Sequence, residues 1–454
     1  MALLLPGIAA LAQQADVQTE SVEVDRSRLL FIDSPVAVGS AELERAAEPL
    51  QVDEPTQQLV TPDPEDDPEF IRRMENIRQY EDSVQTIEGS GGAWDQGLVQ
   101  ELTAMGSLLQ QQGAHGEAID VYERAVHLNR INSGLNTVEQ VPFIEQMISS
   151  YVSLGNWEQV DLYNDYLFYI QQKAYGFQDP RIIPVLENMA TWHVQAFRIG
   201  YGDMLGLRLS TSQMFFDAAA KLVGVHFGKQ DERYISNLRK SANSAYLATR
   251  NSGLMAELDR PDIRNRQQTL RQQLNNRVRS SLPRSYDTGE EALQEIINYH
   301  RELGDFPYDL AEAITNLGDW YLLFGQRHAA QEQYTAAWEF LAVTENAEEL
   351  RGRLFGQVIP LPAFFRSVES ISVPLAESED DPSGLNSDLA DFMFDVSSTG
   401  MVRNISMLTE ETEENAAQLS KLRRTVRNSV FRPIMRDGET VSSEQNYFRY
   451  RYWY

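Results

Sequence analysis

The chain of 454 residues contains no cysteine. Disulfide bonds, thiolate catalysis, cysteine-ligated zinc and a lipid-modified cysteine anchor are therefore excluded. Only six histidines are present, and none forms an H-E-x-x-H pair or a close set with carboxylates, so the sequence predicts no metal site. Neither a G-x-S-x-G elbow nor a G-x-x-x-x-G-K phosphate loop occurs. We therefore expect a protein that is not an enzyme and that carries no cofactor.

Basic residues are also scarce. The chain has 39 Lys and Arg against 67 Asp and Glu, which gives a net charge of −28. Because nucleic-acid phosphates need a basic surface, this balance argues against nucleic-acid binding. Residues 221–284 reverse the sign, with thirteen Lys and Arg against five Asp and Glu. That stretch is either a solvated arginine-rich face or a surface for an acidic partner.

No apolar run is long enough to span a bilayer. The N-terminal run Met1–Ala12 ends in Ala10-Leu11-Ala12, a small-x-small cleavage pattern followed by polar residues. The basic residues that usually open a signal peptide are missing, which fits a signal that begins further upstream. We interpret residues 1–12 as a signal-peptide-like segment and expect export to the periplasm.

Residues 13–92 form an acidic lead-in that we expect to be largely disordered. Between residues 41 and 70 there are ten acidic residues and one basic residue, with Pro55, Pro62, Pro64 and Pro68 among them. Like-charge repulsion and proline both oppose packing. The glycines at 89–92 are expected to act as a hinge.

The pattern from Ala93 to about residue 345 is helical throughout. Apolar residues recur at three- and four-residue spacing. Five of these segments are Ile182–Tyr201, Thr211–Phe227, Glu232–Asn251, Pro261–Ser280 and Thr288–Leu303. Alternating helices joined by short loops predict a stacked α-solenoid over residues 93–345.

The strongest internal pattern is Ile314–Ala337. With Ile314 as position 4 of a 34-residue helix–turn–helix unit, Gly318 stands at position 8 and Tyr334 at position 24. A small residue at position 8 lets two antiparallel helices approach, and large residues at positions 4, 7, 11 and 24 fill the space between them. Seven offsets agree, which is more than a single amphipathic hairpin would match by chance.

Two earlier stretches repeat these offsets. In the 102–125 copy, Gly106 and Tyr122 occupy positions 8 and 24. The 144–167 copy is weaker, because its positions 8, 20 and 24 are Ile148, Val160 and Asn164 instead of small and aromatic residues.

The three copies resemble the tetratricopeptide repeat. In that family positions 2, 5, 9, 12 and 13 face a concave surface, so the resemblance implies a protein-binding surface there. The residues at these positions are Gln100, Thr103, Ser107, Gln110 and Gln111 in the 102–125 copy, with Glu312, Thr315 and Asp319 in the 314–337 copy. The alternative is that these polar side chains are merely solvated.

The period changes from helical to alternating towards the C-terminal end. Ala390–Val396 and Met401–Leu408 alternate around a turn that ends in Gly400, which predicts a β-hairpin. The chain then continues with an amphipathic helix at Glu414–Asn428, Phe431-Arg432-Pro433, a turn at Arg436–Glu439 and the alternating run Asn446–Tyr454. Residues 346–387 are expected to be a linker.

This order of elements resembles the C-terminal domain of TonB-family energy transducers over residues 388–454. The matching residues are Phe394, Val396, Gly400, Val402, Leu408, Leu422, Arg427, Phe431, Pro433, Asp437, Gly438, Glu439 and Val441. No complete membrane helix precedes them, and helical repeats stand where that family has a long proline-rich spacer. The resemblance implies a small α/β domain and envelope or TonB-system components as protein partners.

The terminal run carries the second predicted binding surface. Its residues are Tyr447, Arg449, Arg451 and Trp453, all on one face of the expected strand. We interpret the run as an edge strand that pairs with a partner strand. The alternative is a core strand whose outer face is covered by arginine.

The sequence therefore predicts a mostly α protein: a tetratricopeptide-type α-solenoid followed by a small α/β domain. We expect a periplasmic protein-interaction scaffold that links a partner on the solenoid to an envelope or TonB-type transport component. One alternative is an energy- or force-transducing component of a TonB-type system. A second is an envelope enzyme, since two of the many carboxylates could meet in space.

Overall fold

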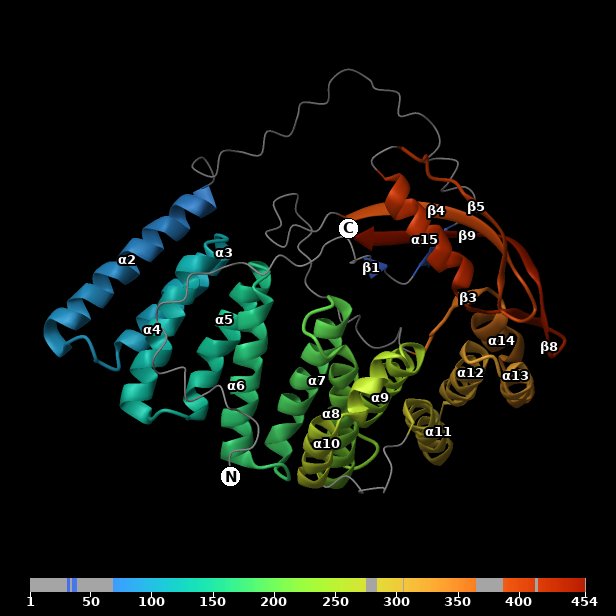
Figure 1. The fold of residues 1–454 in the computed structure, drawn as a ribbon, viewed down its shortest axis with the longest axis horizontal. Coiled ribbons are helices and arrows are strands. Elements are labelled where there is room, and N and C mark those ends of the chain that lie inside the picture. The colour runs from blue at the N-terminus through green and yellow to red at the C-terminus, as the bar shows by residue number, and fades with distance from the viewer. Residues whose placement is uncertain are drawn as a thin grey trace, which may run out of the picture.

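A computed structural model of the protein describes residues 31–32, 35–38, 68–274, 284–304, 306–364, 387–412 and 415–453. The signal-peptide-like segment 1–12 and most of the lead-in lie outside these ranges. The described chain is mostly helical and carries a small region of strands towards its C-terminal end, as predicted (Figure 1). None of its helices is long and apolar enough to cross a membrane.

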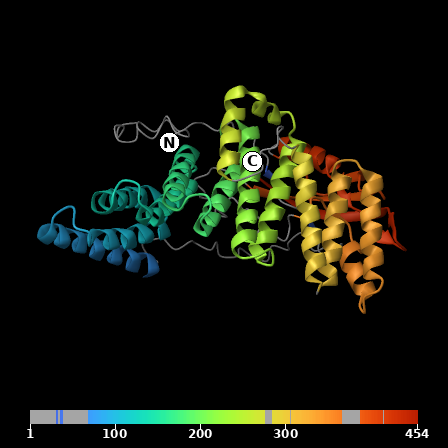
Figure 2. The ribbon, with the colours of Figure 1, turned by 90° about the horizontal axis from the view of Figure 1, so that it is seen from below.

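The helices form a row from α2 at one end to α14 at the other, in which α9 packs directly against α11 and α10 lies against α8 (Figure 1 and Figure 2). Its members are α2 (Pro68–Gly91), α3 (Leu98–Gln111), α4 (His115–Ser133), α5 (Val141–Ser153), α6 (Trp157–Tyr175), α7 (Ile183–Arg198), α8 (Leu205–His226), α9 (Glu232–Arg250), α10 (Pro261–Gln273), α11 (Ser285–Leu303), α12 (Pro307–Leu323), α13 (Arg327–Leu341) and α14 (Ala347–Phe355). Short 3₁₀ turns, η4 (Val138–Gln140), η5 (Pro180–Ile182) and η6 (Leu254–Asp259), precede α5, α7 and α10.

Two hairpins of the row bring a glycine against a tyrosine ring. A β-carbon built on Gly106 of α3 would lie 2.7 Å from the ring of Tyr122 on α4, and one built on Gly318 of α12 would lie 2.7 Å from Tyr334 on α13. Both glycines are buried. The predicted close crossings at positions 8 and 24 are therefore present in both hairpins.

Helix α2 corrects the predicted lead-in, which is not disordered over Pro68–Gly91. Ile77 and Val84 are buried, and Met74 and Ile87 pack around the same apolar cluster. These four residues are spaced three, seven and three apart, which is the helical period. The acidic residues counted over 41–70 end in the first turn of this helix. Their number therefore does not predict whether the residues after them form an apolar helix face.

The C-terminal strands form a mixed-length antiparallel sheet in the order β1-β9-β4-β5. Its long strands are β4 (Ser387–Val396), β5 (Val402–Met407) and β9 (Ser443–Trp453). The predicted β4–β5 hairpin is present, and Gly400 adopts the left-handed φ of 73° that its turn requires. Helix α15 (Ala416–Asn428) buries Leu419, Leu422 and Val426 in the core that it shares with the sheet.

Strand β9 has neighbours on both sides, so the prediction of a free edge is wrong for the described residues. The short strands β1 (Phe31–Ile32) and β2 (Val36–Ala37) pair antiparallel with it, opposite β4. The amide of Val38 also donates to the Tyr447 carbonyl at 3.0 Å. This pairing links residues more than 400 apart in sequence, and composition alone does not predict it.

The predicted linker is ordered over its first part. Helix α14 and strand β3 (Ile359–Pro360) both lie within 346–387, and Leu354 and Phe355 are buried. Strand β3 pairs with β6 (Phe431–Arg432) of the C-terminal region. This part of the chain therefore joins the helical row to the sheet through packed structure.

Candidate functional site

The predicted concave residues of the 314–337 copy are covered by the chain's own C-terminal region. Asp319 is fully buried, and Arg432 from β6 reaches it with Nε donating to Oδ1 at 2.9 Å. The Tyr334 hydroxyl donates to the same oxygen at 2.8 Å. Burial and then the Asp319 charge hold the pKa of Tyr334 well above its usual range, so its hydroxyl stays protonated as a donor.

Thr315 and Asp319 are therefore corrected as candidate binding residues, because neither is open to a partner. Thr315 is buried as well, and its hydroxyl donates to the Ala311 carbonyl at 2.8 Å. Glu312 remains partly exposed. An intramolecular arginine occupies the surface that we expected a partner to use.

A second contact fastens the C-terminal region to α13. The hairpin of β7 (Ile434–Arg436) and β8 (Glu439–Val441) places the Gly438 carbonyl 3.3 Å from the Thr335 hydroxyl, which donates to it. Thr440 donates to Gln331 at 2.8 Å, and Met435 is buried in the apolar cluster of α12, α13 and α14. The row and the sheet are thus held together at several points.

Of the predicted binding residues in the 102–125 copy, some are exposed and others form hydrogen bonds within the helical row. Gln100, Ser107 and Gln111 are exposed, while Thr103 bonds its own helix through the Val99 carbonyl at 2.6 Å. Gln110 joins α3 to α5, since its Nε2 donates to the Gln146 carbonyl and its Oε1 accepts from Tyr122. Their role in binding stays a prediction.

The predicted residues of β9 lie on the sheet. Arg449 makes a bidentate pair with Asp391 of β4, with both N–O distances at 2.8 Å. Tyr447 and Arg451 are half-buried, and the side chain of Trp453 lies outside the described part. Whether these residues bind a partner also stays a prediction.

A pocket that we did not predict lies in the 144–167 copy. It encloses about 310 Å³ between α5, α6 and α7. Its lining comprises Glu145, Ile148, Val152, Val160, Asn164, Leu167, Phe168, Gln171, Val185, Asn188, Met189, Thr191, Trp192 and Gln195. The apolar residues on α6 and α7 are buried, whereas Glu145 and Asn188 are exposed. The pocket therefore has an apolar floor and a polar rim.

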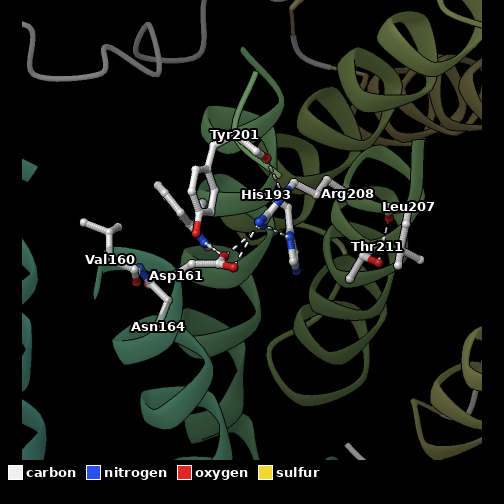
Figure 3. Close-up of polar contacts among 9 residues, drawn as sticks. Val160, Asp161, Asn164, His193, Tyr201, Leu207, Arg208 and Thr211 are labelled. Atoms are coloured by element: carbon white, nitrogen blue, oxygen red, sulfur yellow. Dashed lines mark hydrogen bonds and ion pairs between the residues drawn. The ribbon is translucent and has the colours of Figure 1, made fainter. Parts of the chain in front are cut away.

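The pocket lies at this hairpin's three departures from the repeat pattern. Asn164 stands at position 24, and its Nδ2 turns back to donate to the Val160 carbonyl of its own helix at 2.8 Å (Figure 3). Ile148, Val160 and Asn164, the three departures from the repeat pattern, all line the cavity. In the other two hairpins a tyrosine ring at position 24 lies against glycine at position 8, whereas here a short amide at position 24 is combined with isoleucine at position 8.

The sequence contained a signal for this site. Positions 5 and 12 of the 144–167 copy are Glu145 and Val152, and both line the pocket. Applying the concave offsets to the weakest copy would have named them. The departures at positions 8, 20 and 24 marked the place, but a missing aromatic residue does not by itself distinguish a cavity from a collapsed hairpin.

An ionic cluster holds one wall of the pocket (Figure 3). The indole Nε1 of Trp192 donates to Asp161 Oδ1 at 2.6 Å. Arg208 of α8 grips both oxygens of that carboxylate, at 2.9 and 3.0 Å, and donates to the Tyr201 carbonyl at 3.0 Å. Three helices thus fix the position of the Trp192 ring.

The cluster also sets the charges beside the pocket. Burial would raise the pKa of Asp161, but the hydrogen bonds and charge of Arg208 outweigh it and lower the pKa. Burial and then Arg208 lower the pKa of His193 to about 3, so the neutral ring accepts from Arg208 through Nδ1. Burial and then Asp161 raise the pKa of the nearby Asp165 to about 7.

The same residues give no sign of metal chemistry. Within the described ranges, no three His, Asp or Glu side chains are grouped so that they could hold a metal ion. Arg208 pairs with Asp161 beside the pocket, and the lining itself is apolar or amide in character apart from Glu145 and Thr191. The arrangement is suited to binding through shape and hydrogen bonds.

No family model and no curated protein matches the chain. Among solved structures, the chain is similar to the crystal structure of BtubC (BKLC) from P. vanneervenii. The two share 13% identity with a TM-score of 0.36, over 62% of this chain and 94% of that one. A TM-score of this size carries no argument about partner or activity.

Proposed function

We propose that this protein is a non-enzymatic periplasmic scaffold. In this proposal a tetratricopeptide-type solenoid holds a peptide-like partner, and a TonB-like C-terminal domain contacts an envelope or TonB-type transport component. The repeat assignment is supported by the glycine–tyrosine crossings at Gly106 and Gly318. The domain assignment is supported by the order hairpin, helix and terminal strand in residues 387–453.

One observation carries the proposal: two different surfaces belong to one packed body. The pocket lies between α5 and α7, while the sheet is fastened to α12–α14 by the buried Arg432–Asp319 pair. A scaffold needs separate sites at a fixed distance, and packing across several contacts supplies this. Export rests on the N-terminal apolar run alone.

The test is crosslinking followed by affinity capture from the native envelope with the full chain. We expect two distinct proteins to be recovered, together with fractionation of the chain to the periplasm. Arg451→Glu on the sheet should weaken capture of one partner and leave the other unchanged, while Gln111→Ala in the row should spare the sheet's partner. Recovery from the cytoplasmic fraction, or the loss of both partners with one exposed substitution, contradicts the scaffold.

A further inference from the structure

We propose that the pocket between α5, α6 and α7 binds one aromatic side chain of an extended peptide. This inference rests on the proposed scaffold function and names the side chain that the solenoid recognises.

Comparison of the three hairpins identifies the occupant. In α3–α4 the Tyr122 ring lies against Gly106, and its hydroxyl bonds to Gln110, which reaches across to α5. In α12–α13 the Tyr334 ring lies against Gly318 and near Phe355 of α14, at 6.1 Å between centroids. Each ring therefore lies between the first helix of its hairpin and the helix that follows. The pocket also lies between α5 and α7, and among the described residues its lining carries the short Asn164 at position 24, where the other two hairpins have a tyrosine.

The pocket is large enough for an aromatic side chain. Its volume of about 310 Å³ is at the low end of ligand pockets, which run from about 300 to 1,000 Å³. The floor is formed by Leu167, Val185 and Met189, which are buried and offer dispersion contacts to a ring. Trp192 adds an aromatic wall.

The polar rim fits a peptide main chain. Asn164, Gln171, Asn188 and Gln195 are neutral amides that can both donate and accept, as peptide groups do. Glu145 is the one ionisable lining residue, and it is acidic. A phosphate or carboxylate ligand would find no cation in this lining, so a neutral or basic peptide is the matching class.

The wall of the pocket is preorganised. The Trp192 indole is fixed by its bond to Asp161, and Asp161 is fixed by Arg208. A rigid wall loses little side-chain freedom when the ligand arrives, which favours binding.

The experiment uses the full chain and two short capped peptides. One contains alanine, glutamine and lysine with a central phenylalanine, and its twin has alanine in place of the phenylalanine. Binding is followed by calorimetry and by the fluorescence change of the protein's tryptophans. We expect the phenylalanine peptide to bind roughly tenfold or more tightly than its twin.

Asn164→Tyr fills the pocket from inside and should weaken binding of the phenylalanine peptide by roughly tenfold or more. Gln79→Tyr is the matched control, because it adds the same side chain at an exposed position of α2 outside every predicted binding surface and should leave the affinity unchanged. Equal binding of both peptides, or unchanged binding by folded Asn164→Tyr, overturns the proposal.

A second measurement needs no variant. The same peptide with a photoreactive phenylalanine analogue should crosslink to lining residues such as Met189 and Val152. Crosslinks to residues outside the lining, such as an exposed apolar surface or an interface between two copies of the chain, refute the assignment. This holds even if Asn164→Tyr fails to fold.

The outcome also separates this inference from the proposed function. If Asn164→Tyr still captures the same envelope proteins, the scaffold stands and the pocket is not its peptide site. If the peptide binds in the pocket but the full chain captures no envelope protein, the pocket stands and the scaffold function fails.

Discussion

The α12–α13 and α5–α6 hairpins were predicted from the same offsets and differ in how they are filled. In α12–α13, Tyr334 fills the interior and Arg432 covers Asp319 on the surface, so that the hairpin is closed from both sides. In α5–α6, Asn164 bonds its own helix, and a cavity remains. The two hairpins differ at positions 8, 20 and 24, and the three residues at these positions of α5–α6 all line the cavity.

The two hairpins also differ in their ion pairs. Asp319 and Arg432 have side chains that are 0% and 3% exposed, while Asp161 and Arg208 are 28% and 12% exposed. The first pair joins the row to the sheet, and the second supports the wall of an open pocket. The deeper pair is the more sensitive to losing one partner, because a buried charge without its partner is not solvated.

The largest expected effect comes from breaking the ion pair between Asp319 and Arg432 at the α12–α13 hairpin. Arg432→Met leaves Asp319 buried without its partner and should lower the free energy of unfolding by about 3–5 kcal/mol. Chemical denaturation measures it. Combining the change with Asp319→Leu should restore much of the loss, since two apolar side chains replace the pair. A double variant as unstable as the single one would show that the pair is not the cause.

The next largest effect is expected at the helix crossings where a glycine lies against a tyrosine ring. Gly318→Leu, like Gly106→Leu, drives a side chain into the facing tyrosine ring and should cost about 1–3 kcal/mol or more. At the same repeat position of the open hairpin, Ile148→Leu conserves volume and should cost less than about 1.5 kcal/mol. Thermal unfolding of the three variants compares them. Unchanged melting temperatures for both glycine variants would refute the repeat register.

A smaller effect of opposite sign is expected from closing the open hairpin. Ile148→Gly clears the facing position as in the other two hairpins, and adding Asn164→Tyr to it should raise the stability by about 0.5–2 kcal/mol relative to Ile148→Gly alone. The melting temperature reports it, with Gln111→Tyr as the exposed control. A clear loss of stability would mean that the cavity cannot take a ring.

A pH dependence of stability is also expected beside the pocket. The pKa of Asp165 rises from 3.8 to about 7 on folding, so its contribution to stability is complete below pH 4 and is lost as the pH rises through about 7. Asp165→Asn should therefore gain stability relative to the wild type between about pH 4 and 8. Melting temperatures across this range test it, with exposed Asp120→Asn as the control. Parallel pH profiles for wild type and Asp165→Asn would contradict the shift.

Periodicity predicted the helices and the β4–β5 hairpin because each depends on residues close together in the chain. Long-range contacts decided the rest. Asp319 occupies a position expected to face a partner, and its actual neighbour, Arg432, comes 113 residues later. The pairing of β1 and β2 with β9 is of the same kind. The pocket depends on how the side chains of three helices pack around Ile148, Val160 and Asn164, which the sequence does not reveal.

The pairing of β1 and β2 with β9 has a topological consequence. It closes the chain from α2 to β4 into one large loop, whose two ends meet in a single sheet. The entropy of closing such a loop grows only slowly with its length, so lengthening a turn within the row would weaken the closure little. A cut between Ala37 and α2 would open the loop while leaving the helices untouched. The same cut would turn β1 and β2 into a separate peptide that pairs with β9, converting an intramolecular contact into one that depends on concentration.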